Sequence, residues 1–128
     1  VGLRDLDPGE KATIKKLGVR CFTMRDIDEM GMKAVMQESI RIATDGTVGI
    51  HVSCDMDWID PSFAPGVGTS VRGGGSYRES HLAMEMIADT QKMTSIEVTE
   101  VNPVLDRENM TAELAVEMLT SAFGLRIL

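Results

Sequence analysis

The sequence predicts an α/β fold, with a mainly parallel sheet in a three-layer αβα arrangement. Stretches with the apolar spacing of helices alternate with short runs that are rich in β-branched residues. Helices between strands are the usual crossover connections of parallel sheets, and they cover both faces of the sheet. The chain has 128 residues, of which 43% are apolar, so it has the size and hydrophobic content of one domain, residues 1–128.

The first half of the chain is expected to contain two helices and two strands. A helix over 11–17 follows an Asp-Pro-Gly-Glu turn and ends at Gly18, and a short strand over 19–24 comes next. Apolar residues recur with helical spacing over 26–43, which predicts one helix of several turns. The run over 48–54 is almost continuously apolar, as is typical of a strand that is buried on both faces.

The second half begins with a long loop. Residues 61–75 contain two prolines and five glycines, too many for a regular helix or strand. Loops of this length inside compact domains are usually functional or disordered. Helical spacing returns over 77–92, an alternating strand follows over 95–101, and Pro103 lies just beyond that strand. A last helix is expected over 110–123.

The composition argues against several classes of function. The net charge of −7 and the lack of a Lys/Arg patch argue against nucleic acid as a partner, because phosphates would be repelled. No apolar run approaches the length of a membrane-spanning helix, so no membrane is expected. Cys21 and Cys54 lie in apolar surroundings and are expected to be reduced, as in a cytoplasmic protein. The chain begins with Val1 rather than Met, which favours a fragment of a longer protein.

Two carboxylates follow the predicted strand over 48–54. In an extended chain Asp55 and Asp57 would project from one face, while Cys54 and Met56 would bury on the other. Paired carboxylates suit Mn²⁺, Mg²⁺ or Ca²⁺ better than a structural zinc site. The alternative is that these aspartates only cap a turn.

Other acidic residues are expected at the same edge of the sheet. Glu100 ends the next strand, and Asp5, Asp7 and Glu10 follow a strand-like start. Ligands of parallel sheets bind at the carboxyl ends of the strands, so this edge is the predicted site. A guanidinium is the natural partner of a carboxylate such as Glu100, and a salt bridge to an internal arginine, such as Arg78, is the alternative.

The two histidines of the chain are interpreted as ordinary packing residues. His51 falls in a predicted strand, and His81 and Glu85 are four residues apart on a predicted helix. The glycines of the long loop are not followed by the Gly-Lys-Ser/Thr sequence of a phosphate-binding loop. Neither histidine is therefore assigned to a metal site.

Five segments, taken in order, resemble the C-terminal half of arginases in the ureohydrolase family. They are GLRDLDPGE at 2–10, DMDWIDP at 55–61, PGVGT at 65–69, GGGSYRE at 73–79 and EVNP at 100–103. Tyr77 and the Asp-Pro-Gly-Glu opening favour arginase over agmatinase within that family. The resemblance implies an arginase-like fold, of which this chain is the C-terminal part.

The resemblance also implies a chemistry. Arginases hold two Mn²⁺ ions in each active site and hydrolyse L-arginine to L-ornithine and urea. By this resemblance Asp55 bridges the two metals and Asp57 ligates one of them. Metals of this kind generate the nucleophile by lowering the pKa of bound water.

The substrate side of the site is assigned by the same resemblance. Glu100 is the catalytic residue that orients the guanidinium, and Thr69 lines the pocket beside it. Asp7 and Glu10 recognise the α-amino end of L-arginine, and Asp5 lies beside that end. The resemblance further implies a homo-oligomer, a trimer or a hexamer.

The chain also departs from the family pattern. The family's metal-binding histidine and its Asp-Ala-His-x-Asp strand motif are absent, so the isolated fragment is expected to be inactive. Trp58 stands where Gly is usual, Ser70 where Pro is usual and Gly75 where Leu is usual, and Trp58 is expected to crowd the site. Two alternatives remain open: an amidinohydrolase that acts on agmatine or guanidinobutyrate, and a non-catalytic binding or assembly module.

Overall fold

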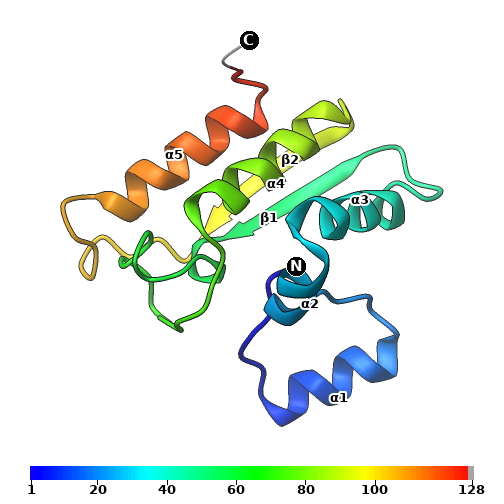
Figure 1. Ribbon diagram of the computed structural model, residues 1–128, viewed down its shortest axis with the longest axis horizontal. Helices are drawn as coiled ribbons and strands as arrows, with labels where there is room; N and C mark the ends of the chain where they lie inside the picture. Colours follow the sequence, from blue (N-terminus) through cyan, green and yellow to red (C-terminus); the bar gives the residue numbers. More distant parts are fainter. Residues whose placement is uncertain (127–128) are drawn as a thin grey trace.

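A two-stranded parallel sheet lies at the centre of the structure, a computed structural model that describes residues 1–126 (Figure 1). The strands are β1 (Ile50–Asp55) and β2 (Met93–Thr99). His51 lies opposite Ser95 and Asp55 lies opposite Thr99 in the parallel register. Helices pack against the sheet, so the predicted α/β class with a parallel sheet is confirmed, although within residues 1–126 they cover one face of the sheet and not both.

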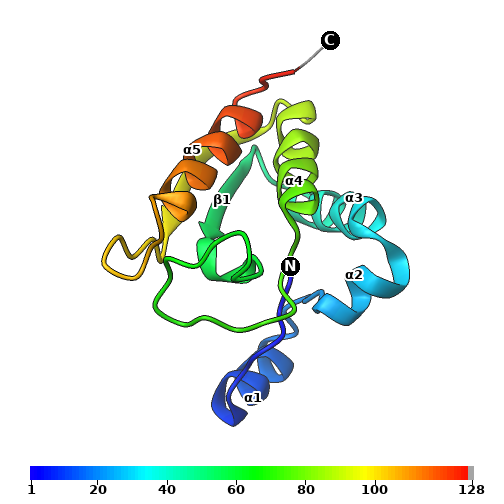
Figure 2. The ribbon, with the colours of Figure 1, turned by 60° about the vertical axis from the view of Figure 1, so that its left-hand side comes forward.

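Three helices build the core with one face of the sheet. Helix α4 contacts both α3 and α5, and the three helices group together in Figure 2. Val52 and Cys54 of β1 point into this core and are 9% and 4% exposed. The helices are α3 (Met32–Ala43), α4 (Tyr77–Asp89) and α5 (Met110–Ala122).

The opposite face of the sheet is polar and exposed. The His51 ring nitrogen Nδ1 lies 2.8 Å from Ser95 Oγ, and the Ser53 hydroxyl donates to Glu97 Oε1 at 2.9 Å. All four side chains are exposed within the described part of the chain. The prediction that this strand is buried on both faces is therefore wrong for these residues, which alternate between buried and exposed.

The N-terminal region contains no regular strand. Residues 19–24 were predicted as a strand, but the structure has only one isolated parallel bridge there, between Leu3 and Thr23. Thr23 instead begins a helix, because its hydroxyl accepts from the Asp26 backbone N–H and Asp26 accepts in return from the Thr23 N–H. The two helices of this region are α1 (Pro8–Leu17), which stands away from the core in Figure 1, and α2 (Met24–Met30).

A single helix over 26–43 is also not observed. Gly31 separates α2 from α3 with φ 81° and ψ 149°, a conformation that is open to glycine and strained for other residues. The break lets Ile27 and Val35 both reach the core, where they are 2% and 0% exposed. The apolar periodicity over 26–43 does correspond to helix, but the bend at Gly31 divides the segment into two helices.

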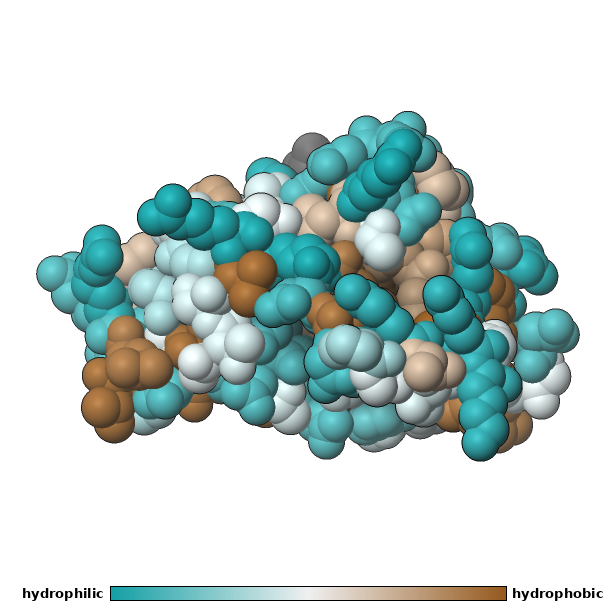
Figure 3. Space-filling view, turned by 90° about the horizontal axis from the view of Figure 1, so that it is seen from below, coloured by the Kyte–Doolittle hydropathy of each residue, from teal (hydrophilic) through white to brown (hydrophobic). Residues whose placement is uncertain are grey.

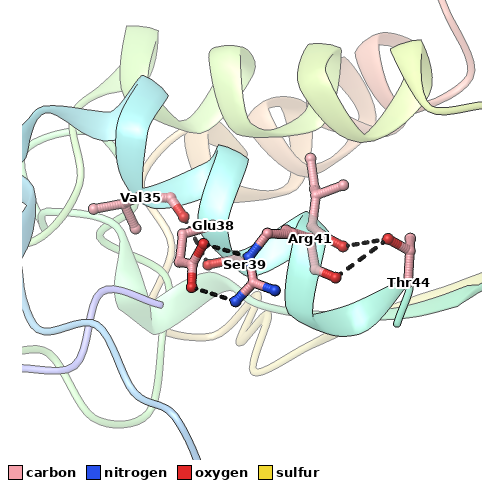
Figure 4. Close-up of polar contacts among 6 residues, drawn as sticks. Val35, Glu38, Ser39, Arg41 and Thr44 are labelled. Carbon is pink, nitrogen blue, oxygen red and sulfur yellow. Dashed lines mark hydrogen bonds and ion pairs between the residues drawn. The ribbon is translucent and has the colours of Figure 1, made fainter. Parts of the chain in front are cut away.

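The outer side of α3 is held by local polar contacts (Figure 4). The Arg41 guanidinium donates to both carboxylate oxygens of Glu38 at 2.7 Å. Ser39 donates to the Val35 carbonyl at 2.9 Å, and Thr44 donates to the Ile40 carbonyl at 2.8 Å. The exposed Arg41–Glu38 pair contributes little free energy, and the hydrogen bonds from Ser39 and Thr44 are partly buried.

Beyond β2 the chain forms an exposed loop before α5. Val104 and Leu105 are 89% and 55% exposed there, and a brown apolar patch lies at the same end of the molecule in Figure 3. Asp106 ends the loop by accepting hydrogen bonds from the backbone N–H groups of Thr111 and Ala112, at 3.1 and 3.2 Å. None of the helices within residues 1–126 is long and apolar enough to cross a membrane.

We predict that Thr111→Val destabilises the fold. The Thr111 hydroxyl is fully buried and accepts from the Gly66 N–H at 2.7 Å, so valine would leave this donor unsatisfied. The expected loss is about 1–3 kcal/mol of unfolding free energy. Urea unfolding measures it, with the exposed Thr120→Val as the matched control. Equal losses in the two variants would contradict the prediction.

Candidate functional site

An acidic cleft of about 500 Å³ opens where β1 ends. In Figure 1 this is the tip of the β1 arrow, beside the loop that follows the strand. The cleft joins three segments that are far apart in the sequence: the first ten residues, the end of β1, and the Gly/Pro-rich loop. It contains most of the predicted site residues, which are Asp5, Asp7, Glu10, Asp55, Asp57 and Thr69.

Asp55 and Asp57 differ in backbone from the prediction. Asp55 is the last residue of β1, but Asp57 lies in a 3₁₀ turn, η1 (Met56–Trp58), and not in extended chain. Asp55 Oδ1 accepts from the Asp57 N–H at 3.2 Å, which begins this turn. Their proximity therefore comes from a tight turn and not from strand alternation. Met56 is fully buried, as expected.

The two carboxylates lie in a repulsive environment. Burial raises the pKa of Asp57, and the negative charges of Asp55 and Glu100 raise it further, while the Arg4 guanidinium lowers it. Burial also raises the pKa of the neighbouring Cys54 thiol to about 12, with a smaller contribution from Asp55. A cation between the aspartates would relieve this repulsion, whereas Cys54 stays a protonated core residue at neutral pH.

Arg4 holds the cleft together and was not predicted as a site residue. Its Nη2 donates to the Asp57 carbonyl at 2.7 Å and its Nη1 donates to the Trp58 carbonyl at 3.0 Å. Nη2 and Nε also donate to the Val71 carbonyl at 2.6 and 3.1 Å. The only sequence signal was a lone cation among the apolar and acidic residues of the N-terminal segment.

Asp7 and Glu10 line the cleft at the start of α1. Asp7 Oδ1 accepts from the N–H groups of Gly9 and Glu10 at 2.6 and 2.9 Å. Glu10 Oε2 accepts from the Asp7 N–H at 2.9 Å, which completes a capping box. The helix start thus fixes both carboxylates, while each keeps a second oxygen for a ligand.

Glu100 follows β2 and is exposed. It does not line the cleft itself, but its charge is close enough to Asp57 to raise the pKa of that carboxyl. Its backbone has φ 65°, which turns the chain away from the strand direction. The alternative of a salt bridge to Arg78 is wrong, because Arg78 Nη2 instead lies 3.5 Å from Glu85 Oε2.

Both histidines lie outside the cleft lining. His51 is on the exposed sheet face, and His81 is buried between α4 and α5 with its Nδ1 2.8 Å from Ser121 Oγ. Within residues 1–126 no group of three or more His, Cys, Asp or Glu side chains is arranged to hold a metal ion. Asp55 and Asp57 therefore fit Mn²⁺ in donor type but supply only part of a coordination shell.

Residues 1–124 match the sequence profile of the arginase family. The chain belongs to this family. It is 52% identical over its whole length to an arginase of Brevibacillus brevis and covers 43% of that protein. The resemblance to the C-terminal half of arginases is thus confirmed, and the chain spans less than half the length of the arginase that it matches. Enzymes of the arginase family are amidinohydrolases.

Solved structures agree with this assignment. The arginase of Bacillus caldovelox superimposes with a TM-score of 0.96 at 51% identity, over 99% of this chain and 42% of that chain. The formimidoylglutamase of Bacillus subtilis superimposes with a TM-score of 0.86 at 34% identity, over 91% of this chain and 36% of that chain. The arginase-like fold is therefore confirmed, and the same fold also occurs in a family enzyme with a different name.

We predict that Arg4→Ala loosens the cleft. The variant loses hydrogen bonds from a charged donor to three carbonyls, so the expected loss is about 2–3 kcal/mol of unfolding free energy. Arg4→Lys recovers only a part, because an ammonium cannot reproduce the guanidinium's planar fork. Urea unfolding measures both, with the exposed Arg72→Ala as control. Full recovery by lysine would contradict the role of the fork.

Asp60 fixes the loop that leaves the turn. Its Oδ1 accepts from the Ser62 hydroxyl at 2.6 Å and from the Ser62 N–H at 3.0 Å, and its Oδ2 accepts from the Gly73 N–H at 2.8 Å. These bonds, led by those from Ser62, lower the pKa of Asp60 to about 2. The ionised carboxylate thus joins the two ends of the Gly/Pro-rich loop.

The lowered pKa of Asp60 predicts acid sensitivity. A carboxyl whose folded pKa lies below its unfolded value, about 3.9, stabilises the fold above that value and loses this contribution as the pH falls toward 2. Asp60→Asn should therefore lower stability at pH 7 and flatten its fall between about pH 4 and pH 2. Chemical unfolding at a series of pH values checks this, and parallel profiles for the variant and the parent chain would refute it.

Proposed function

We propose that the protein containing this chain hydrolyses L-arginine to L-ornithine and urea. The observation that carries the proposal is the acidic cleft. It gathers Asp55 and Asp57 at one end of a parallel strand, with Asp5, Asp7 and Glu10 beside them. Carboxylates at two separate positions suit a substrate with two cationic groups, a guanidinium and an α-ammonium. The similarity to bacterial arginases at about 50% identity supports the same substrate.

Asp55 and Asp57 are the residues of this chain that would hold Mn²⁺. Each would contribute its carboxylate oxygens as metal ligands. When bound, Mn²⁺ supplies a hydroxide nucleophile by lowering the pKa of water. The raised pKa of Asp57 supports the assignment, because burial and the neighbouring Asp55 make its charge costly without a cation.

The remaining residues are assigned to the substrate. Glu100 accepts hydrogen bonds from the guanidinium and orients its carbon toward the metal site, and Thr69 lines the wall beside it. Asp7 and Glu10 receive the α-ammonium group through the oxygens that the capping box leaves free. Asp5 adds negative charge at that end of the cleft.

We further propose that residues 1–128 are inactive alone. Two carboxylates cannot hold a pair of divalent ions, and the described residues offer no third ligand in position. The chain spans 43% of the length of its Brevibacillus relative, so the other ligands are assigned to the rest of the protein. In this proposal residues 1–128 are part of a single ureohydrolase domain in a cytoplasmic trimer or hexamer.

A related amidinohydrolase is the second candidate. The formimidoylglutamase structure superimposes nearly as well as the arginases, so this half of the fold accommodates more than one substrate. Trp58, which is expected to crowd the site, lines the cleft and is a further reason to consider a different substrate. A panel of L-arginine, agmatine, guanidinobutyrate and formimidoylglutamate separates the candidates, and preference for any compound but L-arginine would reject the first.

The activity itself is tested by urea release from L-arginine with Mn²⁺, using the protein as its gene encodes it. Asp55→Asn and Asp57→Asn should each lower kcat/KM by roughly 100-fold or more, because each removes a ligand charge. The exposed Asp45→Asn, outside the cleft, is the control and should keep full activity. Activity in either ligand variant equal to that of the control would overturn the metal assignment. Urea release by residues 1–128 alone would overturn the inactivity of the fragment.

A further inference from the structure

The Trp58 ring lies in a slot that two glycines create. A Cβ atom on Gly2 would lie 2.7 Å from the Cε3 atom of the ring, and a Cβ atom on Gly75 would overlap three carbons of the same ring. Contacts this short do not occur in folded proteins, so neither position can carry a side chain while the ring stays in place. The two glycines come from opposite ends of the site, the N-terminal segment and the end of the long loop.

The backbone of Trp58 is anchored by the same neighbours. The Gly75 N–H donates to the Trp58 carbonyl at 3.0 Å, and the Asp60 N–H donates to the Gly75 carbonyl at 2.9 Å. Arg4 donates to the Trp58 carbonyl as well, at 3.0 Å. Ring and peptide are therefore fixed together, and a shift of the ring would pull on the turn that carries Asp57.

Trp58 also divides two cavities. It lines the acidic cleft of about 500 Å³ and an apolar groove of about 280 Å³ between β1, α3 and α4. Asp55 borders both cavities as well. The indole thus forms the boundary between the carboxylates and the apolar side of the sheet, directly after Asp57 in the chain.

The Trp58 ring and the missing side chain of Gly75 meet at this point. The structure brings these positions into contact, and the ring fills the space that a side chain at 75 would need. Part of the space that the Trp58 ring needs is thus provided by the missing side chain at Gly75.

We propose that Trp58 and Gly75 are a matched pair that positions the Asp57 turn. Bulk at 58 requires its absence at 75, because a side chain at 75 would overlap the ring. Trp58 is a positioning residue that acts through the backbone of the turn. The part of the proposal that concerns metal affinity rests on the proposed function, in which Asp57 is a ligand.

The test is a double-mutant cycle in the protein as its gene encodes it. Gly75→Leu overpacks the slot and Trp58→Gly empties it, so each should lower the thermal midpoint by roughly 5–10 °C. The double variant Trp58→Gly/Gly75→Leu should be more stable than either single variant, because the leucine side chain fills part of the space that the indole leaves. Phe63→Gly, which removes an exposed aromatic ring from the same loop, is the control and should change the midpoint by less than the single variants.

Three readouts separate positioning from bulk stability. The emission that is lost in Trp58→Gly belongs to Trp58, and this part of the spectrum should move to longer wavelength in Gly75→Leu as the ring leaves its slot. Hydrogen exchange at the Asp57 amide, which donates to Asp55 Oδ1, should quicken at least about tenfold in each single variant and recover in the double variant. Mn²⁺ affinity, followed by the loss of the free-ion EPR signal, should fall and recover in the same pattern.

Additive midpoints, with the double variant less stable than either single one, would overturn the matched pair. Recovered midpoints with unchanged exchange at Asp57 in all variants would overturn the positioning role. If the parent protein binds no Mn²⁺, the proposed function fails, while the midpoints and the Asp57 exchange still decide the matched pair. These outcomes keep the two proposals distinguishable.

Discussion

The parallel pairing of β1 with β2 is the constraint on which the site depends. Parallel strands end at the same edge, and the register sets Asp55 opposite Thr99, so Glu100 follows one position later. An antiparallel pair would send these carboxylates to opposite ends of the sheet. The crossover between the strands contains both the long loop and α4, and it therefore carries Thr69 and Gly75 to the same edge.

The acidic residues at one edge of the sheet repel one another, and the positive charge of Arg4 offsets part of this repulsion. This residue brings a positive charge to the backbone beneath Asp57 without neutralising the carboxylates that face the cleft. Its guanidinium satisfies carbonyls from two loops that lack the regular pairing of a sheet. Structural cohesion and electrostatic compensation thus come from one side chain, while the remaining repulsion contributes to the raised pKa of Asp57.

The sequence was sufficient for the parts of the structure that depend on local pattern. The α/β class, β1, α4 and α5 follow from periodicity, and the five segments that resemble arginases led to the correct family. Most of the site residues meet in one cleft, as the rule for parallel sheets predicts. These successes share a cause, because apolar spacing and strand polarity are both readable without knowledge of distant contacts.

The errors arose where a single residue or a distant contact decides the backbone. Thr23 forms a capping box with Asp26 and turns a β-like run into a helix start, and Gly31 breaks a periodic helix without interrupting its apolar pattern. The 3₁₀ turn at Asp57 depends on hydrogen bonding to Asp55 and on Arg4, which is more than fifty residues away. Periodicity carries no information on such contacts. The hydrogen bonds from Arg4 to Asp57 and Val71 could therefore not be predicted from the sequence.

The backbone at Glu100 is locally strained. A glutamate with φ 65° is held in the left-handed region, where a residue with a Cβ costs about 1–2 kcal/mol. Glycine would end β2 there with less strain, and it would also remove the carboxylate. Position 100 is thus a point of local frustration, at which the residue best for stability is not the residue present. Engineering for thermal resistance alone would be drawn to this position, and the resulting stable protein would lack the negative charge that raises the pKa of Asp57.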